Sequence, residues 1–353
     1  MATLKDIAKS VGVSVPTVSL ILSGNGARYR PETRQAVTRA AKRLKYRPNM
    51  AGRGLRQKKS FLLGTLFYGV NSAHMSDFLR GVGAALAGNE YAPVVFSHDT
   101  PEEEADHLSR CQHRRVDGYI VNLAVAPDGR TAAAAYGPLL KKKVPVVEIF
   151  GRFLKGAIQV NVDNAAAGRL AAEHLLAQGH RRIAMLTHGA YDAARATGVG
   201  PHFDAWEHWQ GYASAMREAG QEPLAITHPL VEAESYQEQF FRGGVECLAA
   251  LRAHPARRTA VCCLSDQHGA GLLRACRAAG VAVPGELAVV GFGDTELSRV
   301  TQPALTTFRM PAWEVGFEAA RRLLALTRGE TPGSVLLEPE LLVRESVGGA
   351  ETP

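Results

Sequence analysis

Apolar residues near the start of the chain recur at the spacing of short helices. One such series ends at Gly12, which permits a tight turn, and a second follows Ser14, a residue suited to the N-cap position. A third follows Pro31, which is tolerated at the start of a helix. The apolar positions are Leu4, Ile7, Ala8 and Val11, then Val15, Val18 and Leu22, then Val37, Ala40, Ala41 and Leu44. This succession predicts a helix-turn-helix with a third supporting helix.

From Ser60 onward the pattern changes to apolar strands that alternate with helices. The expected strands are 61–68, 93–97, 118–122, 144–149, 183–187, 260–264 and 287–292, and the expected helices include 77–87, 102–114, 210–218, 245–252 and 272–279. Repeated β-α units predict an α/β fold, with parallel sheets and helices on both faces. Ligands of such sheets bind outside the carboxyl ends of the strands.

Charge separates the two parts of the chain. Residues 1–59 contain 14 Lys or Arg and two acidic residues, a net +12, so the remainder carries −5 of the total of +7. A basic module on a mildly acidic body is typical of a protein that binds nucleic acid, although a solvated charged face would carry the same charge.

Two features bear on the cellular compartment. No apolar run reaches the roughly 18–20 residues that a membrane helix needs, and the first residues lack the layout of a signal peptide, so we expect a cytoplasmic protein without membrane contact.

The five scattered cysteines are Cys111, Cys247, Cys262, Cys263 and Cys276. They are expected to be buried free thiols, and a redox or metal role for the adjacent pair is disfavoured because that pair lies in an apolar run. We expect no cofactor and no metal.

Within the helix-turn-helix, the second helix is expected to enter the major groove of DNA. Its exposed residues would be Val15, Pro16, Thr17 and Leu20. The hydroxyls of Thr17 and Ser19 can hydrogen-bond to bases or phosphates, whereas Val15 and Leu20 offer apolar contacts only. Basic side chains that suit the phosphates are Lys9, Arg28, Arg30, Arg34 and Lys45.

Several short runs occur in a fixed order along the whole chain. Those of the N-terminal part are Leu4-Lys5-Asp6-Ile7-Ala8, Gly12-Val13-Ser14, Thr17-Val18-Ser19, Thr33-Arg34, Leu44-Lys45-Tyr46-Arg47-Pro48-Asn49, Arg53 and Leu55. Those of the body include Val116-Asp117-Gly118, Val162-Asp163-Asn164, Gly179-His180-Arg181, Val289-Val290-Gly291-Phe292 and Ala304-Leu305-Thr306-Thr307. Together they closely resemble the lactose-repressor family.

The resemblance implies four parts. They are a helix-turn-helix DNA-binding headpiece at 1–47, a hinge helix and linker at 48–59, a two-lobed effector-binding and dimerisation domain at 60–347, and a short tail at 348–353. The body would resemble periplasmic sugar-binding proteins, whose lobes close on a ligand by hinge motion. The tail has no heptad pattern, so we expect a homodimer rather than a tetramer.

The resemblance also implies the DNA contacts. In the family, paired hinge helices lie in the minor groove, where the residue matching Leu55 wedges between base pairs. Gly52 and Gly54 each cost roughly 1 kcal/mol relative to alanine in a helix, which predicts a hinge that is disordered without DNA. Ser23 stands where asparagine is frequent, which puts a phosphate contact in doubt. The implied DNA-binding residues are Thr3, Ser14, Val15, Pro16, Thr17, Ser19, Leu20, Ser23, Arg34, Tyr46, Asn49, Arg53 and Leu55.

The implied effector site departs from the family pattern. The corresponding residues are His74, Met75, Phe150, His208, Ser265, Asp266 and Asp294. His208 stands where arginine is usual, Ser265 where asparagine is usual, and Gly293 where aspartate is usual. Losing the guanidinium weakens the case for an acidic or ordinary sugar ligand.

Residues 188–209 form a stretch that is longer than usual in the family. Trp206 and Trp209 suggest an aromatic lid over a ligand ring. A metal site is a second interpretation, and a plain surface loop is a third. The residues that bear on a metal site are His188, His202, His208, Asp192 and Asp204.

The sequence therefore predicts a sequence-specific DNA-binding transcriptional regulator, a repressor of a palindromic operator under the control of a sugar or related metabolite. A corepressor-dependent regulator of a non-sugar metabolite is an alternative. A periplasmic-type solute-binding protein would need an export signal and no basic headpiece. The phosphate-loop, nucleophile-elbow and H-E-x-x-H motifs are not found, so no enzyme is expected. A chromosome-coating protein would show no preference for one palindrome. The effector, the operator and the direction of control stay open.

Overall fold

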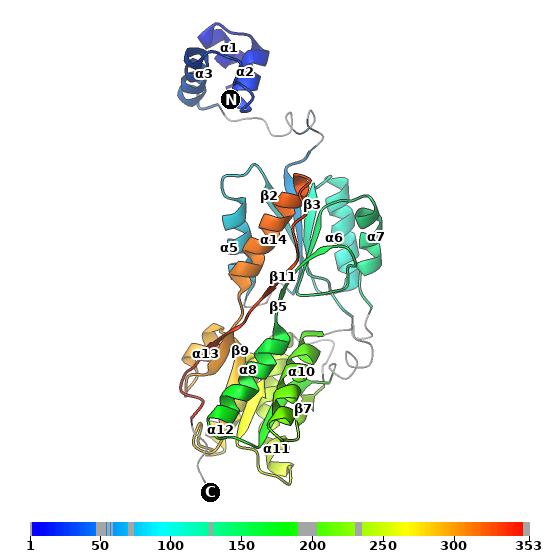
Figure 1. Ribbon diagram of the computed structural model, residues 1–353, viewed down its shortest axis with the longest axis vertical. Helices are drawn as coiled ribbons and strands as arrows, with labels where there is room; N and C mark the ends of the chain where they lie inside the picture. The colour runs from blue at the N-terminus through cyan, green and yellow to red at the C-terminus, as the bar shows by residue number, and fades with distance from the viewer. Residues whose placement is uncertain are drawn as a thin grey trace. The chain divides into compact units, whose positions relative to one another are not determined.

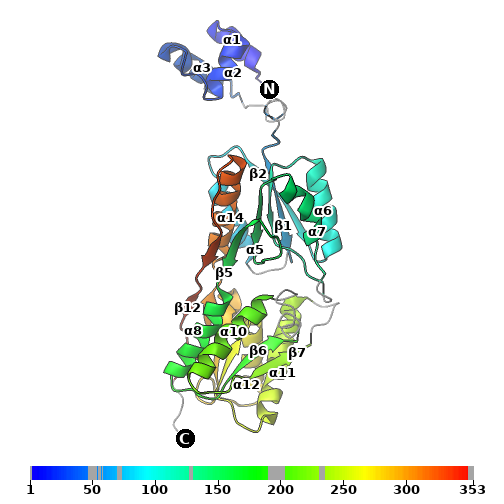
Figure 2. The ribbon, with the colours of Figure 1, turned by 45° about the vertical axis from the view of Figure 1, so that its right-hand side comes forward.

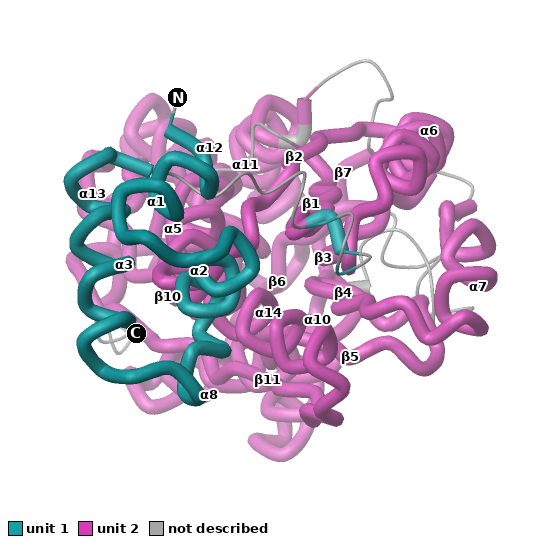
Figure 3. The backbone as a smooth tube through the Cα atoms, turned by 90° about the horizontal axis from the view of Figure 1, so that it is seen from above, with its two compact units in different colours: residues 1–60 teal, residues 61–353 magenta. Residues whose placement is uncertain are grey.

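The computed structural model describes residues 2–46, 54, 57, 59–69, 74–126, 130–189, 203–229 and 235–348. The chain divides into two compact units, residues 1–60 and 61–353, which Figure 3 colours separately. We refer to them as the headpiece and the body and describe each by itself.

The headpiece contains the three helices that the sequence predicts. They are α1 (Leu4–Val11), α2 (Val15–Leu22) and α3 (Pro31–Arg43). Thr3 and Asp6 form a capping box at the start of α1, and Gly12 ends it in the left-handed conformation at φ +75°. Ile7, Val18 and Val37 are fully buried where the three helices meet. The predicted hinge residues Asn49, Gly52, Arg53 and Leu55 lie outside the described residues.

The first lobe of the body is a parallel six-stranded sheet in the order β11-β5-β4-β3-β1-β2. Its strands are β1 (Leu62–Tyr68), β2 (Ala92–His98), β3 (Gly118–Val121), β4 (Val146–Ile149), β5 (Ile158–Val162) and β11 (Val335–Leu337). Its helices are α5 (Met75–Leu86), α6 (Pro101–His113), α7 (Ala133–Lys141) and α14 (Ala312–Thr327). Figure 1 shows α5 and α14 on one face of this sheet and α6 and α7 on the other, with an apolar core on each side.

The second lobe repeats this architecture in the order β12-β10-β9-β8-β6-β7, with only β12 antiparallel to its neighbour among the described strands. Its strands are β6 (Ile183–His188), β7 (Ala225–His228), β8 (Ala260–Cys263), β9 (Ala288–Gly293), β10 (Thr306–Arg309) and β12 (Glu340–Leu342). Its helices are α8 (Asn164–Ala177), α10 (Phe203–Glu218), α11 (Tyr236–Ala253), α12 (Asp266–Ala278) and α13 (Glu296–Val300). The apolar cores place α8 and α10 on one face and α11 and α12 on the other (Figure 2).

The chain passes between the lobes three times. It crosses from β5 to α8, returns from β10 to α14, and crosses again from β11 to β12 (Figure 1). The two-lobed α/β body that the sequence predicts is therefore confirmed, and the three connections lie where two lobes could hinge.

Paired glycines allow the helices on each sheet to approach closely. A Cβ at Gly81 of α5 would lie 2.0 Å from the carbonyl oxygen of Trp313, and a Cβ at Gly316 of α14 would lie 2.1 Å from that of Phe78. The same reciprocal arrangement recurs between α8 and α10 and between α11 and α12, at Gly168, Gly211, Gly244 and Gly271. At these contacts backbone meets backbone, so no side chain fits.

The two ends of the stretch 188–209 belong to regular elements and not to a plain surface loop. His188 ends strand β6, and residues 203–209 form the first two turns of α10. Ala205 packs into the same apolar core as Tyr212, so burial extends the helix towards the N-terminus beyond the predicted 210–218. The part of the stretch from 190 to 202 lies outside the described residues.

The cysteines match the expectation of buried free thiols. Burial raises the pKa of Cys262 to about 12, which keeps that thiol protonated and unreactive. No helix among the described residues is long and apolar enough to cross a membrane.

Candidate DNA-binding surface and ligand cavity

The start of α2 is held by its own hydroxyl groups. The Ser14 Oγ accepts a hydrogen bond from the Thr17 backbone N–H at 3.3 Å and lies 2.8 Å from the Thr17 Oγ1. Hydrogen bonds with Thr17 and Arg28 lower the pKa of Tyr29, so the loop that follows α2 returns to its first turn. These contacts fix the first turn of the helix that is expected to meet base edges.

The other predicted DNA-binding residues are spread over the headpiece. Pro16 and Arg34 are exposed, whereas Ser19, Leu20 and Ser23 are partly buried. Val15, Thr17 and Leu20 were expected to be exposed, and this is wrong in part because all three are partly buried, Val15 by packing on the headpiece core. Thr3 is engaged in the capping box, and Tyr46 packs against the core.

The basic side chains of the headpiece are not neutralised within it. Residues 2–46 contain nine Lys or Arg and two acidic residues, and no ion pair occurs among them. One of the two acids, Asp6, is occupied by its hydrogen bonds with Thr3. Such a surface attracts the phosphates of DNA.

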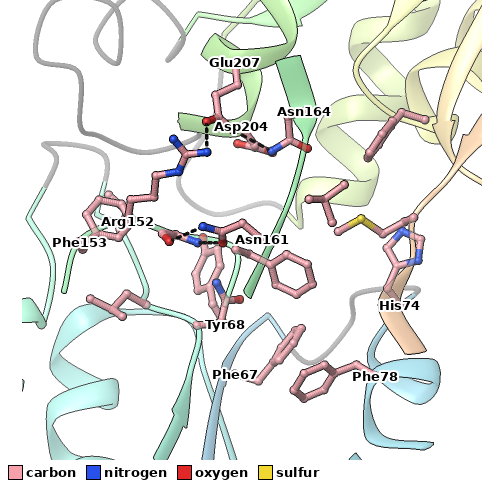
Figure 4. Close-up of a pocket in the computed structure, with 18 residues that line it drawn as sticks. Phe67, Tyr68, His74, Phe78, Arg152, Phe153, Asn161, Asn164, Asp204 and Glu207 are labelled. Carbon is pink, nitrogen blue, oxygen red and sulfur yellow. Dashed lines mark hydrogen bonds and ion pairs between the residues drawn. The ribbon is translucent and has the colours of Figure 1, made fainter. Parts of the chain in front are cut away.

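A cavity of about 250 Å³ lies in the body and is lined by residues of both lobes (Figure 4). Six aromatic rings contribute to its wall, and they belong to Phe67, Tyr68, Phe78, Phe150, Phe153 and Phe292. The polar lining includes Asn122, Arg152, Asn161, Asn164, Asp204 and Glu207. The first-lobe lining comes from the carboxyl ends of the strands, as expected for a parallel sheet.

The loop after β4 is held rigidly at the cavity. Glu148 is fully buried and accepts hydrogen bonds from the backbone N–H groups of Phe153 at 2.8 Å and Leu154 at 3.1 Å. Asn161 both accepts from the Gly151 N–H and donates to the Gly151 carbonyl oxygen, each at 3.0 Å. Burial raises the pKa of Glu148, and the two backbone donors oppose that rise. The loop therefore presents Arg152 to the cavity in a defined position.

An ion pair joins the two lobes beside the cavity. The Arg152 guanidinium of the first lobe lies 3.0 Å from the Glu207 carboxylate of α10, and Asn164 at the start of α8 donates to the same carboxylate at 3.1 Å (Figure 4). Burial raises the pKa of Glu207, whereas Asn164 and Arg152 lower it. Sequence reasoning missed all three residues, although Arg152 follows a buried strand directly.

The structure brings two of the seven predicted effector residues to this cavity, namely His74 and Phe150. Burial lowers the pKa of His74, so the ring is neutral at pH 7. Met75 is buried and packs in the core of the first lobe, away from the lining.

The predicted acidic residues do not line the cavity. The fully buried Asp266 accepts hydrogen bonds from the Thr295 N–H at 2.7 Å and from the Thr307 hydroxyl at 2.5 Å. Asp294 is paired with Arg299 at 2.8 Å and with Arg344 at 2.5 Å. These carboxylates hold the segment after β9 inside the second lobe.

Ser265 and His208 are also engaged within the second lobe. Ser265 caps α12, and its Oγ lies 2.9 Å from the His268 Nδ1. The buried His208 ring lies 2.9 Å from the Asp204 carbonyl oxygen and meets the Phe292 ring edge-on at 4.6 Å. Gly293 has φ +138°, a backbone conformation that would be strained for the aspartate usual at this position, and a Cβ there would also crowd the Asp266 Oδ2 at 3.2 Å.

The metal interpretation of 188–209 receives no support from the residues that the structure places. His188 stacks on Phe240 at 5.6 Å, and His208 points into the second lobe. In the described part of the chain, no group of three or more His, Cys, Asp or Glu could hold a metal ion. His202 and Asp192 lie outside that part.

Known proteins resemble both units of the chain. Residues 3–49 match the model of the lacI family of bacterial regulatory proteins, and residues 172–347 match that of a periplasmic binding protein-like domain. The CelR regulator of Thermobifida fusca is 31% identical over 360 residues, which cover 98% of this chain and 98% of that protein. The ribose operon repressor of Haemophilus influenzae is 29% identical over 352 residues, which cover 98% and 99%. Among solved structures, a CelR–cellobiose complex has a TM-score of 0.65 at 28% identity and covers 98% of this chain and 100% of that chain.

Proposed function

The chain belongs to the lacI family of bacterial regulatory proteins, and we propose that it represses transcription as a cytoplasmic homodimer. We propose further that a small molecule, when it binds between the lobes, changes the affinity of this dimer for its operator. Its function as a DNA-binding transcriptional regulator follows from the family. The curated relatives named above are regulators, and we propose no catalytic activity for this chain.

One observation carries the proposal: the basic helix-turn-helix is joined to a body with a cavity that both lobes line. The headpiece carries positive charge that no neighbouring acid neutralises among its described residues. In the body, the ion pair between Arg152 and Glu207 couples occupancy of the cavity to the relative position of the lobes. A ligand that favours one lobe arrangement shifts the operator equilibrium by its differential affinity, typically about 1–3 kcal/mol.

The homodimer follows from DNA geometry. A palindromic operator presents two half-sites about one helical turn apart, and a single three-helix headpiece spans one of them. Names of relatives support a small organic effector, since one relative represses a ribose operon and another is seen with cellobiose.

Selection of duplexes from a random pool by the purified full-length chain tests DNA recognition. We expect one palindrome to be enriched and bound far more tightly than a scrambled duplex at the same salt concentration. Arg34→Ala should weaken binding to both duplexes equally and reduce the slope of log affinity against log salt by about 0.9, as for one lost phosphate contact. Leu20→Ala should change which base is preferred.

Lys142→Ala is the matched control, because Lys142 is an exposed cation of the body at the end of α7. It should leave both affinities unchanged. Absence of any enriched palindrome would refute the proposed function.

A further inference from the structure

The two acidic residues expected at the effector site of the second lobe are not offered to a polyhydroxylated ligand in the part of the lobe that the structure describes. A sugar needs several donors and acceptors that are not already engaged. Asp266 and Asp294 are both engaged by side chains of their own lobe, and neither lines the cavity. Position 293 is a glycine at φ +138°, so it supplies no third carboxylate.

The polar lining of the cavity is largely engaged as well. Asn161 uses both ends of its amide on Gly151, and the amide nitrogen of Asn164 is directed to Glu207. One terminal nitrogen of the Arg152 guanidinium is directed to Glu207 too, and this pairing neutralises its charge. Among the described lining residues, these contacts leave fewer directed hydrogen bonds for sugar hydroxyls.

Aromatic surface and one carboxylate remain. Phe150 is partly exposed, and its ring meets that of Phe67 edge-on, with the ring centroids 6.3 Å apart. Phe67 packs in turn against Phe78 at a centroid distance of 5.1 Å, and these two rings are buried behind Phe150 in the core of the first lobe. The carboxylate of Asp204 forms no hydrogen bond and no ion pair with the residues that the structure describes, and it lines the same cavity (Figure 4). With Glu207 and Arg152, the lining carries a formal charge of −1.

Aromatic faces and a carboxylate attract organic cations, because the negative face of each ring and the carboxylate act on the same positive charge. The volume of about 250 Å³ is below the roughly 300–1,000 Å³ of pockets for drug-sized ligands, so the ligand is small. We propose that the effector is a small aromatic amine, with its ring against Phe150, which Phe67 and Phe78 support from behind, and its ammonium group directed to Asp204. This inference rests on the proposed function and replaces the sugar expected from the relatives.

Calorimetric titration of the full-length chain at pH 7 tests the proposal with probes of one shape and different charge. The probes are 2-phenylethylamine, its uncharged counterpart 2-phenylethanol and the anionic 3-phenylpropanoate, with ribose and cellobiose as sugars. We expect the amine to bind at least tenfold more tightly than the alcohol and the anion to bind most weakly of the three. Tighter binding of either sugar than of the amine, or no binding of the amine, would overturn the proposal.

Two variants of Asp204 separate charge from packing. Asp204→Asn should weaken amine binding about tenfold and leave alcohol binding unchanged, and Asp204→Lys should make the anion the preferred probe. Asp204 is exposed, so both variants should fold. Asp106→Asn, at an exposed acid on α6 that pairs with Arg110, is the control and should change nothing. Unchanged amine binding in both Asp204 variants would contradict the assignment.

The two proposals fail differently. Selective operator binding without any response to the amine would remove the ligand assignment and leave the regulator intact. Loss of operator selectivity would remove the proposed function even if the amine bound.

Discussion

Glu104 is a carboxyl group in the interior of the first lobe. It is fully buried, accepts a hydrogen bond from the Tyr136 hydroxyl at 2.6 Å and another from the Ala124 N–H at 2.9 Å. It also lies 3.6 Å from His98. Burial raises the pKa of Glu104 to about 7 and lowers that of His98 to about 4, so both groups are largely neutral between these two pH values. Through Ala124, Glu104 supports the segment after β3 whose neighbours line the cavity.

Glu104→Gln should remove a pH dependence of stability. The pKa of Glu104 is higher in the folded chain, at about 7, than its ordinary value of 4.5. The contribution of Glu104 to the free energy of unfolding is therefore complete below pH 4.5 and is lost as the pH rises to 7. Between these values the free energy of unfolding falls by at most about 1.4 kcal/mol per pH unit. Urea unfolding of the wild-type chain and of Glu104→Gln between pH 4.5 and 8 measures the difference in their free energies of unfolding. His98 contributes in the opposite direction in both proteins, so its contribution largely cancels in that difference.

Asp106→Asn, at an exposed acid on the same helix, serves as the control for this experiment. A difference between the wild-type chain and Glu104→Gln that stays constant with pH would show that Glu104 is ionised in the folded protein.

Helix pairs are the elements on which the lobes depend. In each pair, glycines on both helices let backbone pack on backbone, and every pair covers one face of a sheet. Gly81 and Gly211 fall inside helices that the sequence predicts, and a glycine inside a helix costs about 1 kcal/mol relative to alanine. The structure shows the compensating contact, since a Cβ at Gly81 or Gly316 would overlap the facing helix.

Gly81→Ala and Gly83→Ala should have opposite effects although both lie on α5. A Cβ at Gly81 would meet the Trp313 carbonyl oxygen at 2.0 Å, whereas one at Gly83 would meet nothing within 4 Å. We expect Gly81→Ala to lower the free energy of unfolding by about 1–3 kcal/mol through overpacking. Gly83→Ala should raise it by up to about 1 kcal/mol through helix propensity. Urea titrations measure both, and equal effects of the two variants would argue against close packing of α5 on α14.

At the scale of the whole body, few polar contacts are identified between the lobes in the described residues, and the ion pair of Arg152 and Glu207 is one of them. The side chain of Glu207 is 12% exposed, whereas both partners of the Arg130–Glu102 pair within the first lobe are more than 60% exposed. Coulombic attraction is weaker in water than at a partly buried site.

A double-mutant cycle on Arg152→Gln and Glu207→Gln should give a coupling on the order of 1 kcal/mol or more that falls only modestly with added salt. The same cycle on Arg130→Gln and Glu102→Gln should give about 0.5 kcal/mol or less and should vanish at high salt. Unfolding free energies of the four variants of each cycle supply the couplings. Identical couplings at both sites would mean that the lobes are not held by this pair.

Sequence by itself determined the helices of the headpiece, the alternation of strands and helices, and the family. These depend on neighbours a few residues apart: the capping box of Thr3 and Asp6 and the apolar spacing of α1 to α3 are complete within single helical turns. The four-residue strands β3, β4 and β8 were predicted because they are mostly apolar, whereas β7 and β10 mix polar and apolar residues and β11 has only three residues.

Only the tertiary structure decided which polar side chains reach the cavity. Asp266 finds its partners 29 and 41 positions away, and these contacts direct its carboxylate into the second lobe. Arg152 of the first lobe forms an ion pair with Glu207 of the second lobe, and the two residues lie far apart in the sequence. Hydrogen-bond partners far apart in sequence leave no local pattern, so position in a motif indicated where a site lies but not which groups are available to a ligand.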